Sequence, residues 1–218
     1  MKLISLNTGR PREVEWNGGT VLTSIWKNPR EGRLRVTSLN IDGDQQSDLS
    51  VHGGRDKAVY VYPSEHYEFW RRELPRADLP WGAFGENLTS EGLLETEVAI
   101  GDRIQVGSAE FVVTQPRQPC FKLGILFGRD DMIKRFLLSG RSGFYVAVVQ
   151  EGELAAGDSI AFTHRAVNSL SVSIIVDLRT RDEQNADLLR RAVELTELSG
   201  GWREHFRKRL AEQGGTIA

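Results

Sequence analysis

Residues 103–114 read RIQVGSAEFVVT and decide the fold class, because they contain two short segments rich in β-branched and aromatic residues. We predict strands over residues 103–106 and 109–114. Segments of the same kind recur from residue 1 to about residue 164, and Gly, Asn and Asp often separate them. This part of the chain is therefore predicted to be mainly β.

The other predicted strands cover residues 2–8, 20–26, 32–36, 58–62, 143–149 and 159–162. So many short strands favour a closed or nearly closed barrel, because closure removes exposed sheet edges. Two short helices are expected to interrupt the strands. One covers residues 64–74 with Ser64 as its cap, and the other covers residues 130–139 and ends before Gly140. The first fold prediction is a β-barrel with short peripheral helices.

The pattern changes after His164, where apolar residues begin to recur at helical spacing. Residues 182–198 and 201–213 both predict amphipathic helices. Residues 169–178 space three apolar side chains by four, although their β-branched run leaves a strand as an alternative. We predict a barrel domain over residues 1–163 and a small helical domain over residues 164–218.

Composition excludes several classes of protein. The 28 basic residues nearly balance the 30 acidic ones, which gives a net charge of −2 and no general attraction to nucleic acid or anionic membranes. The first residues lack the pattern of a signal peptide, and no apolar run reaches membrane-spanning length. We expect a cytoplasmic protein whose partners are neither a nucleic-acid polymer nor a membrane.

Cys120 is the only cysteine, so it forms neither an internal disulfide nor a zinc site of several thiolates. It lies in the segment TQPRQPCFKL, residues 114–123, where two prolines are expected to stiffen a loop. Arg117 and Lys122 favour the thiolate, which is the form that attacks electrophiles or binds a soft metal. An inert buried thiol and a pair with His52 or His66 remain alternatives.

A polar loop precedes the strand predicted at residue 58. Its Gly53 and Gly54 let backbone amides approach a ligand, and Arg55 and Lys57 can donate charge-assisted hydrogen bonds to a phosphate. An ordinary solvated turn explains the same residues. The chain has no P-loop and no dinucleotide-binding glycine pattern.

Two further glycine-containing segments could bind a polar ligand. Residues 81–89 combine glycines with amide and hydroxyl groups, and Arg141 lies between glycines directly before a predicted strand. Taken one at a time, these segments are also compatible with plain turns.

The motifs in their order resemble the YiiM branch of the MOSC family. They are HGG at residues 52–54 followed by KAVY at 57–60, FGENL at 84–88, QPRQPCFKL at 115–123 and GRSGFY at 140–145. The helical tail is similar to the three-helix domain that follows the barrel in this branch. The resemblance covers nearly the whole chain and implies a mainly β fold, a MOSC-type β-barrel followed by a small α-helical domain.

The resemblance implies that the barrel holds a molybdenum cofactor (molybdopterin), with Cys120 as the catalytic protein ligand to the metal. It further implies an oxidoreductase that reduces N-hydroxylated compounds such as hydroxylaminopurines, a detoxification reaction. Electrons would come from a separate flavin or iron–sulfur protein, since one cysteine is too few for a cluster within this chain.

The remaining site residues follow from the same resemblance. The candidates to bind the cofactor, by its phosphate or its pterin, are His52, Gly53, Gly54, Arg55, Lys57, Asn87, Arg117, Lys122 and Arg141. Two other functions stay open: a sulfur carrier with a persulfide on Cys120, and a cofactor-binding protein without turnover. The physiological substrate and the oligomeric state are left undetermined.

Overall fold

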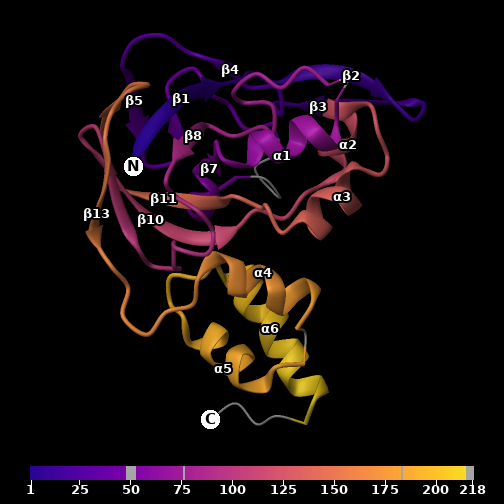
Figure 1. Ribbon diagram of the computed structural model, residues 1–218, viewed down its shortest axis with the longest axis vertical. Helices are drawn as coiled ribbons and strands as arrows, with labels where there is room; N and C mark the ends of the chain where they lie inside the picture. Colours follow the sequence, from indigo (N-terminus) through magenta and orange to yellow (C-terminus); the bar gives the residue numbers. More distant parts are fainter. Residues whose placement is uncertain (48–52, 76, 183, 215–218) are drawn as a thin grey trace.

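The structure, a computed structural model, describes residues 1–47, 53–75, 77–182 and 184–214. A β-rich part carries the N-terminus, and three helices that lie to one side of it carry the C-terminal end of the chain (Figure 1). The strands are β1 (Lys2–Thr8), β2 (Arg12–Trp16), β3 (Gly19–Thr23), β4 (Asn28–Pro29), β5 (Leu34–Thr37), β6 (Asn40–Ile41), β7 (Val59–Pro63), β8 (Leu88–Glu91), β9 (Arg103–Val106), β10 (Ala109–Pro116), β11 (Phe144–Gln150), β12 (Gly152–Leu154) and β13 (Ile160–His164). The helices are α1 (His66–Glu73), α2 (Phe121–Phe127), α3 (Met132–Ser139), α4 (Val172–Thr180), α5 (Ala186–Glu194) and α6 (Gly200–Glu212), with a 3-10 turn η1 (Arg55–Lys57).

The main sheet has eight strands in the order β13-β9-β10-β11-β7-β8-β1-β4. Strand β10 pairs with β9 and β11 in antiparallel fashion, and every one of its residues except Glu110 is buried. Strands β7 and β8 run parallel, whereas the other pairs in this sheet are antiparallel. The predicted mainly β character of residues 1–164 is confirmed, with short helices between the strands.

The closed barrel is not confirmed. The eight-stranded sheet ends at β13 on one side and β4 on the other. Strand β1 meets the start of β13 through one isolated bridge, between Lys2 and Ser159. Three backbone hydrogen bonds accompany it, from Leu3 to the Asp158 carbonyl at 2.9 Å, from Gly157 to the Leu3 carbonyl at 2.7 Å and from Ile160 to the Met1 carbonyl at 3.0 Å. An isolated bridge is not a continuous pairing of two strands, so closure of the barrel stays a prediction.

Helix α2 was not predicted, because the two prolines before Cys120 suggested a continuous loop. The helix begins directly after Cys120 and ends at Phe127. Gly128 follows with a φ of 61°, the left-handed conformation that glycine adopts readily at a helix end. The proposed cap of α1 was also wrong. Ser64 lies one residue ahead of the capping position, which Glu65 occupies without a side-chain cap.

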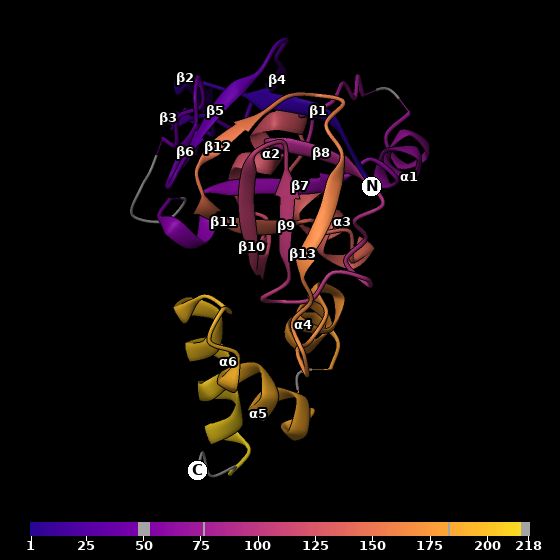
Figure 2. The same cartoon turned by 90° about the vertical axis from the view of Figure 1, so that its left-hand side faces the viewer.

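The three C-terminal helices share the main hydrophobic core with the sheet. The same cluster of buried residues includes Val113 of β10, Ile175 of α4 and Phe206 of α6. Backbone hydrogen bonds also join the two parts, from Val172 to the Val98 carbonyl at 2.9 Å and from Ser199 to the Thr114 carbonyl at 3.3 Å. Figure 2 shows α4, α5 and α6 below the β-rich part, with α4 beneath β13. The predicted boundary at residue 163 stays a prediction.

A second core consists mainly of aromatic side chains between α1, α3 and β7. Its fully buried members include Tyr62, Trp70, Phe84 and Phe136, and the Trp70 and Phe136 rings stack with centroids 5.9 Å apart. The close packing of these large rings makes this part of the fold rigid. Within the described ranges, no helix combines the length and apolar character needed to cross a membrane.

Candidate functional site

Cys120 lies between strand β10 and helix α2, directly before the first residue of the helix. Pro119 precedes it, and its own backbone is extended, with φ −121° and ψ 173°. Its carbonyl accepts a 2.9 Å hydrogen bond from the Leu123 amide, so the backbone is fixed by the first turn of the helix. The thiol is half-buried and unpaired with another cysteine. The backbone at Cys120 is thus fixed, and part of the thiol is accessible to a ligand.

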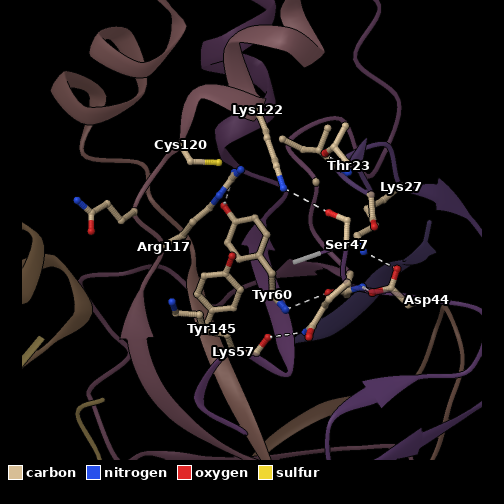
Figure 3. Close-up of a pocket in the computed structure, with 16 residues that line it drawn as sticks. Thr23, Lys27, Asp44, Ser47, Lys57, Tyr60, Arg117, Cys120, Lys122 and Tyr145 are labelled. Carbon is tan, nitrogen blue, oxygen red and sulfur yellow. Dashed lines mark hydrogen bonds and ion pairs between the residues drawn. The ribbon is translucent and has the colours of Figure 1, made fainter. Parts of the chain in front are cut away.

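Cys120 faces a polar cavity of about 650 Å³, counting its open mouth. Figure 3 shows Cys120 and Lys122 on one side of the cavity and Tyr60 and Tyr145 on another. The lining residues are Thr23, Ser24, Ile25, Lys27, Asp44, Gln46, Ser47, Lys57, Tyr60, Gly85, Asn87, Arg117, Gln118, Cys120, Lys122 and Tyr145.

Two buried lysines on this cavity differ in their partners. Lys27 forms an ion pair with Asp44, and burial lowers the pKa of Lys27 although Asp44 opposes the shift. The Lys122 ammonium instead donates to the Ser47 hydroxyl at 3.3 Å. Within residues 1–47, 53–75, 77–182 and 184–214, no carboxylate lies at ion-pair distance from Lys122. Lys122 is therefore placed to neutralise an anionic ligand.

Arg117 is buried between the cavity and the aromatic core. Its guanidinium donates to the Phe84 carbonyl at 2.7 Å and lies 4.8 Å from the centre of the Tyr60 ring. Burial opposes the positive charge, but the nearby Tyr60 and Tyr145 raise the pKa of Arg117 above its usual value. One of its roles is to hold the segment around Phe84 in place.

Asn87 also lines the cavity, but its side chain is already used by the protein. Its oxygen accepts from the Tyr60 amide at 3.1 Å, and its nitrogen donates to Asp44 at 3.0 Å and to the Asn7 carbonyl at 3.3 Å. The structure thus gives Asn87 a clear positioning role. Its predicted contact with a pterin stays a prediction.

Glu86 is a positioning residue that the motif did not reveal. It is fully buried and accepts hydrogen bonds from the Tyr67 hydroxyl, the Gly82 amide at 2.9 Å, the Phe84 amide at 3.1 Å and the Thr89 hydroxyl at 2.8 Å. Burial raises the pKa of Glu86, although these donors act against the shift. Its carboxylate fixes the turn that supplies Gly85 and Asn87 to the cavity.

A second, more open cleft also reaches Cys120, on the side of the C-terminal helices. It measures about 1520 Å³, counting its open mouth. The lining residues are Gly53, Gly54, Arg55, Asp56, Lys57, Gln115, Gln118, Pro119, Cys120, Tyr145, Arg179, Ser199, Gly200, Gly201, Trp202 and His205. Gly53, Gly54 and Arg55 lie on this cleft only, whereas Lys57 lies on both. Cys120 therefore lines both the cavity and the cleft.

Of three further candidates, two lie apart from this arrangement. His52 is outside the described residues. Arg141 lines neither space, since its guanidinium lies 3.9 Å from the centre of the Phe69 ring and donates to the Ser139 carbonyl at 3.0 Å. His66 is 2.8 Å from Glu95 and lines neither space, so its geometry does not support a pair with Cys120.

The residues of the smaller cavity fit an anionic metal cofactor. A soft thiol stands at its edge beside the cation of Lys122, and sulfur ligands suit soft metal centres. The buried Ser24 hydroxyl lines the cavity and has no hydrogen-bond partner among the described residues, which leaves it available to a ligand. Within the described part of the chain, no cluster of three His, Cys, Asp or Glu side chains could hold a metal by itself.

Comparison with protein families gives two matches that together span most of the chain. Residues 48–161 match the MOSC domain, and residues 170–213 match the YiiM-like, 3-alpha helix domain. The crystal structure of YiiM from Geobacillus stearothermophilus has a TM-score of 0.81 and 35% sequence identity to this chain. That alignment covers 96% of this chain and 98% of the YiiM chain.

Two further relatives were found among known sequences. The protein YflK of Bacillus subtilis (strain 168) is 40% identical over 207 residues, which is 95% of this chain and 93% of YflK. A protein of Gibberella moniliformis named "Reductase" is 35% identical over 173 residues. That match covers 78% of this chain but only 30% of the larger protein.

Proposed function

Because the chain belongs to the MOSC family and carries a YiiM-like three-helix domain, we propose that it is a molybdenum-cofactor-dependent reductase of N-hydroxylated compounds. The observation that carries the proposal is the position of Cys120, the only cysteine, at the meeting point of two spaces. One space is small, polar and lined by cations, and the other is open. A cofactor and a substrate would approach the same thiol from these two sides.

The chain's own groups would divide the work of holding a molybdopterin. Cys120 would supply the protein thiolate, and Lys122 would neutralise the cofactor phosphate or another of its negative charges. Ser24 offers a hydroxyl without a partner among the described residues. Arg117 and Glu86 would act behind them as positioning residues, because both fix the segment that ends at Asn87. We also propose that the barrel is closed and that the cofactor sits in it.

The cofactor, when bound, supplies two-electron oxygen-atom chemistry that no amino-acid side chain provides. In the proposed reaction the N–O bond of R–NHOH breaks, two electrons and two protons are taken up, and the products are R–NH2 and water. The electrons come from a separate flavin or iron–sulfur protein. The relative named "Reductase" is consistent with this class of reaction. We propose detoxification of N-hydroxylated bases in the cytoplasm as the role.

The direct test is turnover of 6-N-hydroxylaminopurine by protein made in a host that synthesises the cofactor, with dithionite-reduced methyl viologen as the electron source. We expect adenine to form in proportion to the electron donor consumed. Metal-loaded protein that forms no adenine would contradict the reductase assignment. A sulfane sulfur on Cys120 in metal-free protein would point instead to sulfur carriage.

Replacement of Lys122 tests the anion site. Lys122→Met is expected to lower cofactor retention about tenfold, because a charge-assisted hydrogen bond in a buried site is lost. Retention is measured as the molybdenum that stays on the chain during dialysis. Lys134→Met is the matched control, since Lys134 is an exposed residue of α3. Equal retention by both variants would remove Lys122 from the cofactor site.

A further inference from the structure

The motif GRSGFY, residues 140–145, contains a glycine that packs against the wall of the smaller cavity. Gly143 has a φ of 60°, a conformation that glycine adopts more readily than other residues. A Cβ atom there would lie 2.5 Å from the Val61 carbonyl oxygen and 2.8 Å from carbon atoms of the Tyr60 and Tyr62 rings. Because Tyr60 lines the cavity, the position of Gly143 affects the shape of the cavity.

Two backbone carbonyls of this motif hold groups of the same wall. The Ser142 carbonyl accepts a 2.8 Å hydrogen bond from the Tyr60 hydroxyl. The Gly143 carbonyl accepts a 3.3 Å hydrogen bond from the Arg117 amide. The Arg117 guanidinium lies 3.4 Å from the Tyr60 hydroxyl, and Figure 3 shows the two side chains next to each other below Cys120. The positions of Tyr60 and Arg117 therefore depend on the backbone of Ser142 and Gly143.

Glu95 holds this backbone from the side away from the cavity. Its Oε1 accepts a 2.6 Å hydrogen bond from the Gly143 amide. The residue is 4% exposed and lines neither the cavity nor the cleft. Hydrogen bonds to an ionised carboxylate are stronger than those between neutral groups. This contact is therefore a strong anchor for Gly143.

His66 holds the carboxylate of Glu95 in turn. Its Nε2 atom lies 2.8 Å from one carboxylate oxygen and 3.0 Å from the other. An ionised carboxylate only accepts hydrogen bonds, so Nε2 carries the hydrogen in this contact. His66 is the first residue of α1, and its buried ring packs edge-on against Tyr62 at 5.3 Å between ring centres. With a partner on each side, the Glu95 carboxylate has little freedom to move.

We infer that Glu95 is a positioning residue for the cavity that is proposed to hold the cofactor. It acts through the backbone at Gly143 on the wall made by Tyr60 and Arg117. The inference rests on the proposed function and adds to it a residue that contacts neither the cofactor nor the substrate. Loss of the carboxylate would leave the buried Gly143 amide without this partner and would allow the wall to shift. The cofactor would then be held less tightly.

Glu95→Ala is the first test. We expect it to lower cofactor retention about tenfold, because replacing groups that support a metal site typically costs 10–100-fold in metal affinity. Retention is measured as the molybdenum that stays on the chain during dialysis, on protein from a host that makes the cofactor. Glu95→Gln should stay within about twofold of wild type, since glutamine keeps an acceptor for the Gly143 amide.

Asp102→Ala is the matched control for the loss of a buried carboxylate. Asp102 is fully buried and also accepts from backbone amides, those of Ala99 at 2.9 Å and Ala166 at 2.8 Å. It lines neither the cavity nor the cleft. We expect Asp102→Ala and Glu95→Ala both to lower the urea midpoint of unfolding, but only Glu95→Ala to lower retention. Equal retention by these two variants would overturn the inference, whether both keep the cofactor or both lose it.

A double-mutant cycle with Tyr60→Phe tests the route from Glu95 to the cavity. Tyr60→Phe removes the hydroxyl that donates to the Ser142 carbonyl and should itself lower retention. Residues of one hydrogen-bond network do not contribute additively. We therefore expect Glu95→Ala to cost less retention in the Tyr60→Phe protein than in wild type. Full additivity of the two losses would overturn the inference.

Hydrogen exchange on cofactor-free protein gives a measurement that needs neither metal nor turnover. We expect peptides that cover residues 140–145 to exchange at least about tenfold faster in Glu95→Ala than in wild type, and Asp102→Ala to keep the wild-type rate there. If Glu95→Ala does not fold, His66→Ala replaces it, because this variant removes the support of Glu95 and keeps the Gly143 contact. Faster exchange is again expected, and the wild-type rate in His66→Ala would overturn the inference.

The two proposals fail in different ways in these measurements. Wild-type protein that takes up no molybdenum or forms no adenine would refute the reductase, whereas faster exchange in Glu95→Ala would still show that Glu95 holds the cavity wall. Turnover by wild type, with retention and exchange unchanged in Glu95→Ala, would support the reductase and refute the positioning role.

Discussion

Cys120→Ala is expected to abolish the reduction of 6-N-hydroxylaminopurine and to leave the fold intact. Substitution of residues that merely support a metal ligand lowers metal affinity or activity 10–100-fold, so loss of the ligand itself should lower kcat by more than about hundredfold. The fold should survive because the thiol is only half-buried and the neighbouring helix is held by the Cys120 backbone carbonyl, which alanine retains. Activity is measured as adenine formation and folding as the thermal midpoint.

Cys120→Ser separates the chemistry of sulfur from the shape of the side chain. It keeps the size of the group but replaces a soft ligand with a hard one, so we expect it to be as inactive as Cys120→Ala. Wild-type rates in both variants, with unchanged molybdenum, would show that the metal is held without Cys120.

Glu86→Ala is expected to cause the largest loss of stability. Its carboxylate accepts from four donors in a fully buried site, and alanine would leave these donors without a partner. Each stranded donor costs about 1–3 kcal/mol, partly relieved by water or relaxation, so we expect a total loss of about 4 kcal/mol. Urea unfolding measures this loss as a change in the free energy of unfolding.

Glu91→Ala is the control for this prediction, because Glu91 is exposed at the end of β8. Its effect should stay within about 0.5 kcal/mol. If Glu86→Ala were as mild as Glu91→Ala, the four hydrogen bonds would contribute little to the turn, and the geometry of the smaller cavity would need another support.

The sequence was most informative where local pattern and burial agree. Strands β1 and β9 were predicted with their observed bounds, because short β-branched segments between turn residues have few alternatives. Strand β8 was missed, since Leu88–Glu91 is short and polar and becomes a strand only by pairing with β1 and β7. Such pairing is a tertiary effect that no local pattern contains.

The candidate site shows the same division between local and tertiary information. The single cysteine and its neighbouring cations identified Cys120 and Lys122, and the structure brings both to one cavity. Ser24 and Gln115 were not singled out as site residues, because a serine or glutamine near a strand is common and only burial without a partner distinguishes these two. Arg141 had a suitable motif, yet it packs on Phe69.

The contribution of the C-terminal helices to the site was beyond the reach of sequence patterns. The predicted helix over residues 201–213 was expected for its amphipathic spacing, and α6 is found at Gly200–Glu212. Nothing in that spacing brings Gly201 and Trp202 to the same cleft as Gln115. The proximity arises because the Ser199 amide donates to the Thr114 carbonyl at the end of β10, a contact between residues about 85 positions apart.

The measurement that tests the account most directly is the molybdenum content per chain, determined by elemental mass spectrometry on wild type and Cys120→Ala from a host that makes the cofactor. The account predicts nearly one molybdenum per wild-type chain and a large loss in the variant, with both proteins equally folded. Equal molybdenum in the two proteins would contradict the assignment of Cys120 as the ligand. No molybdenum in either, with a sulfane sulfur on Cys120 of the wild type, would contradict the cofactor itself.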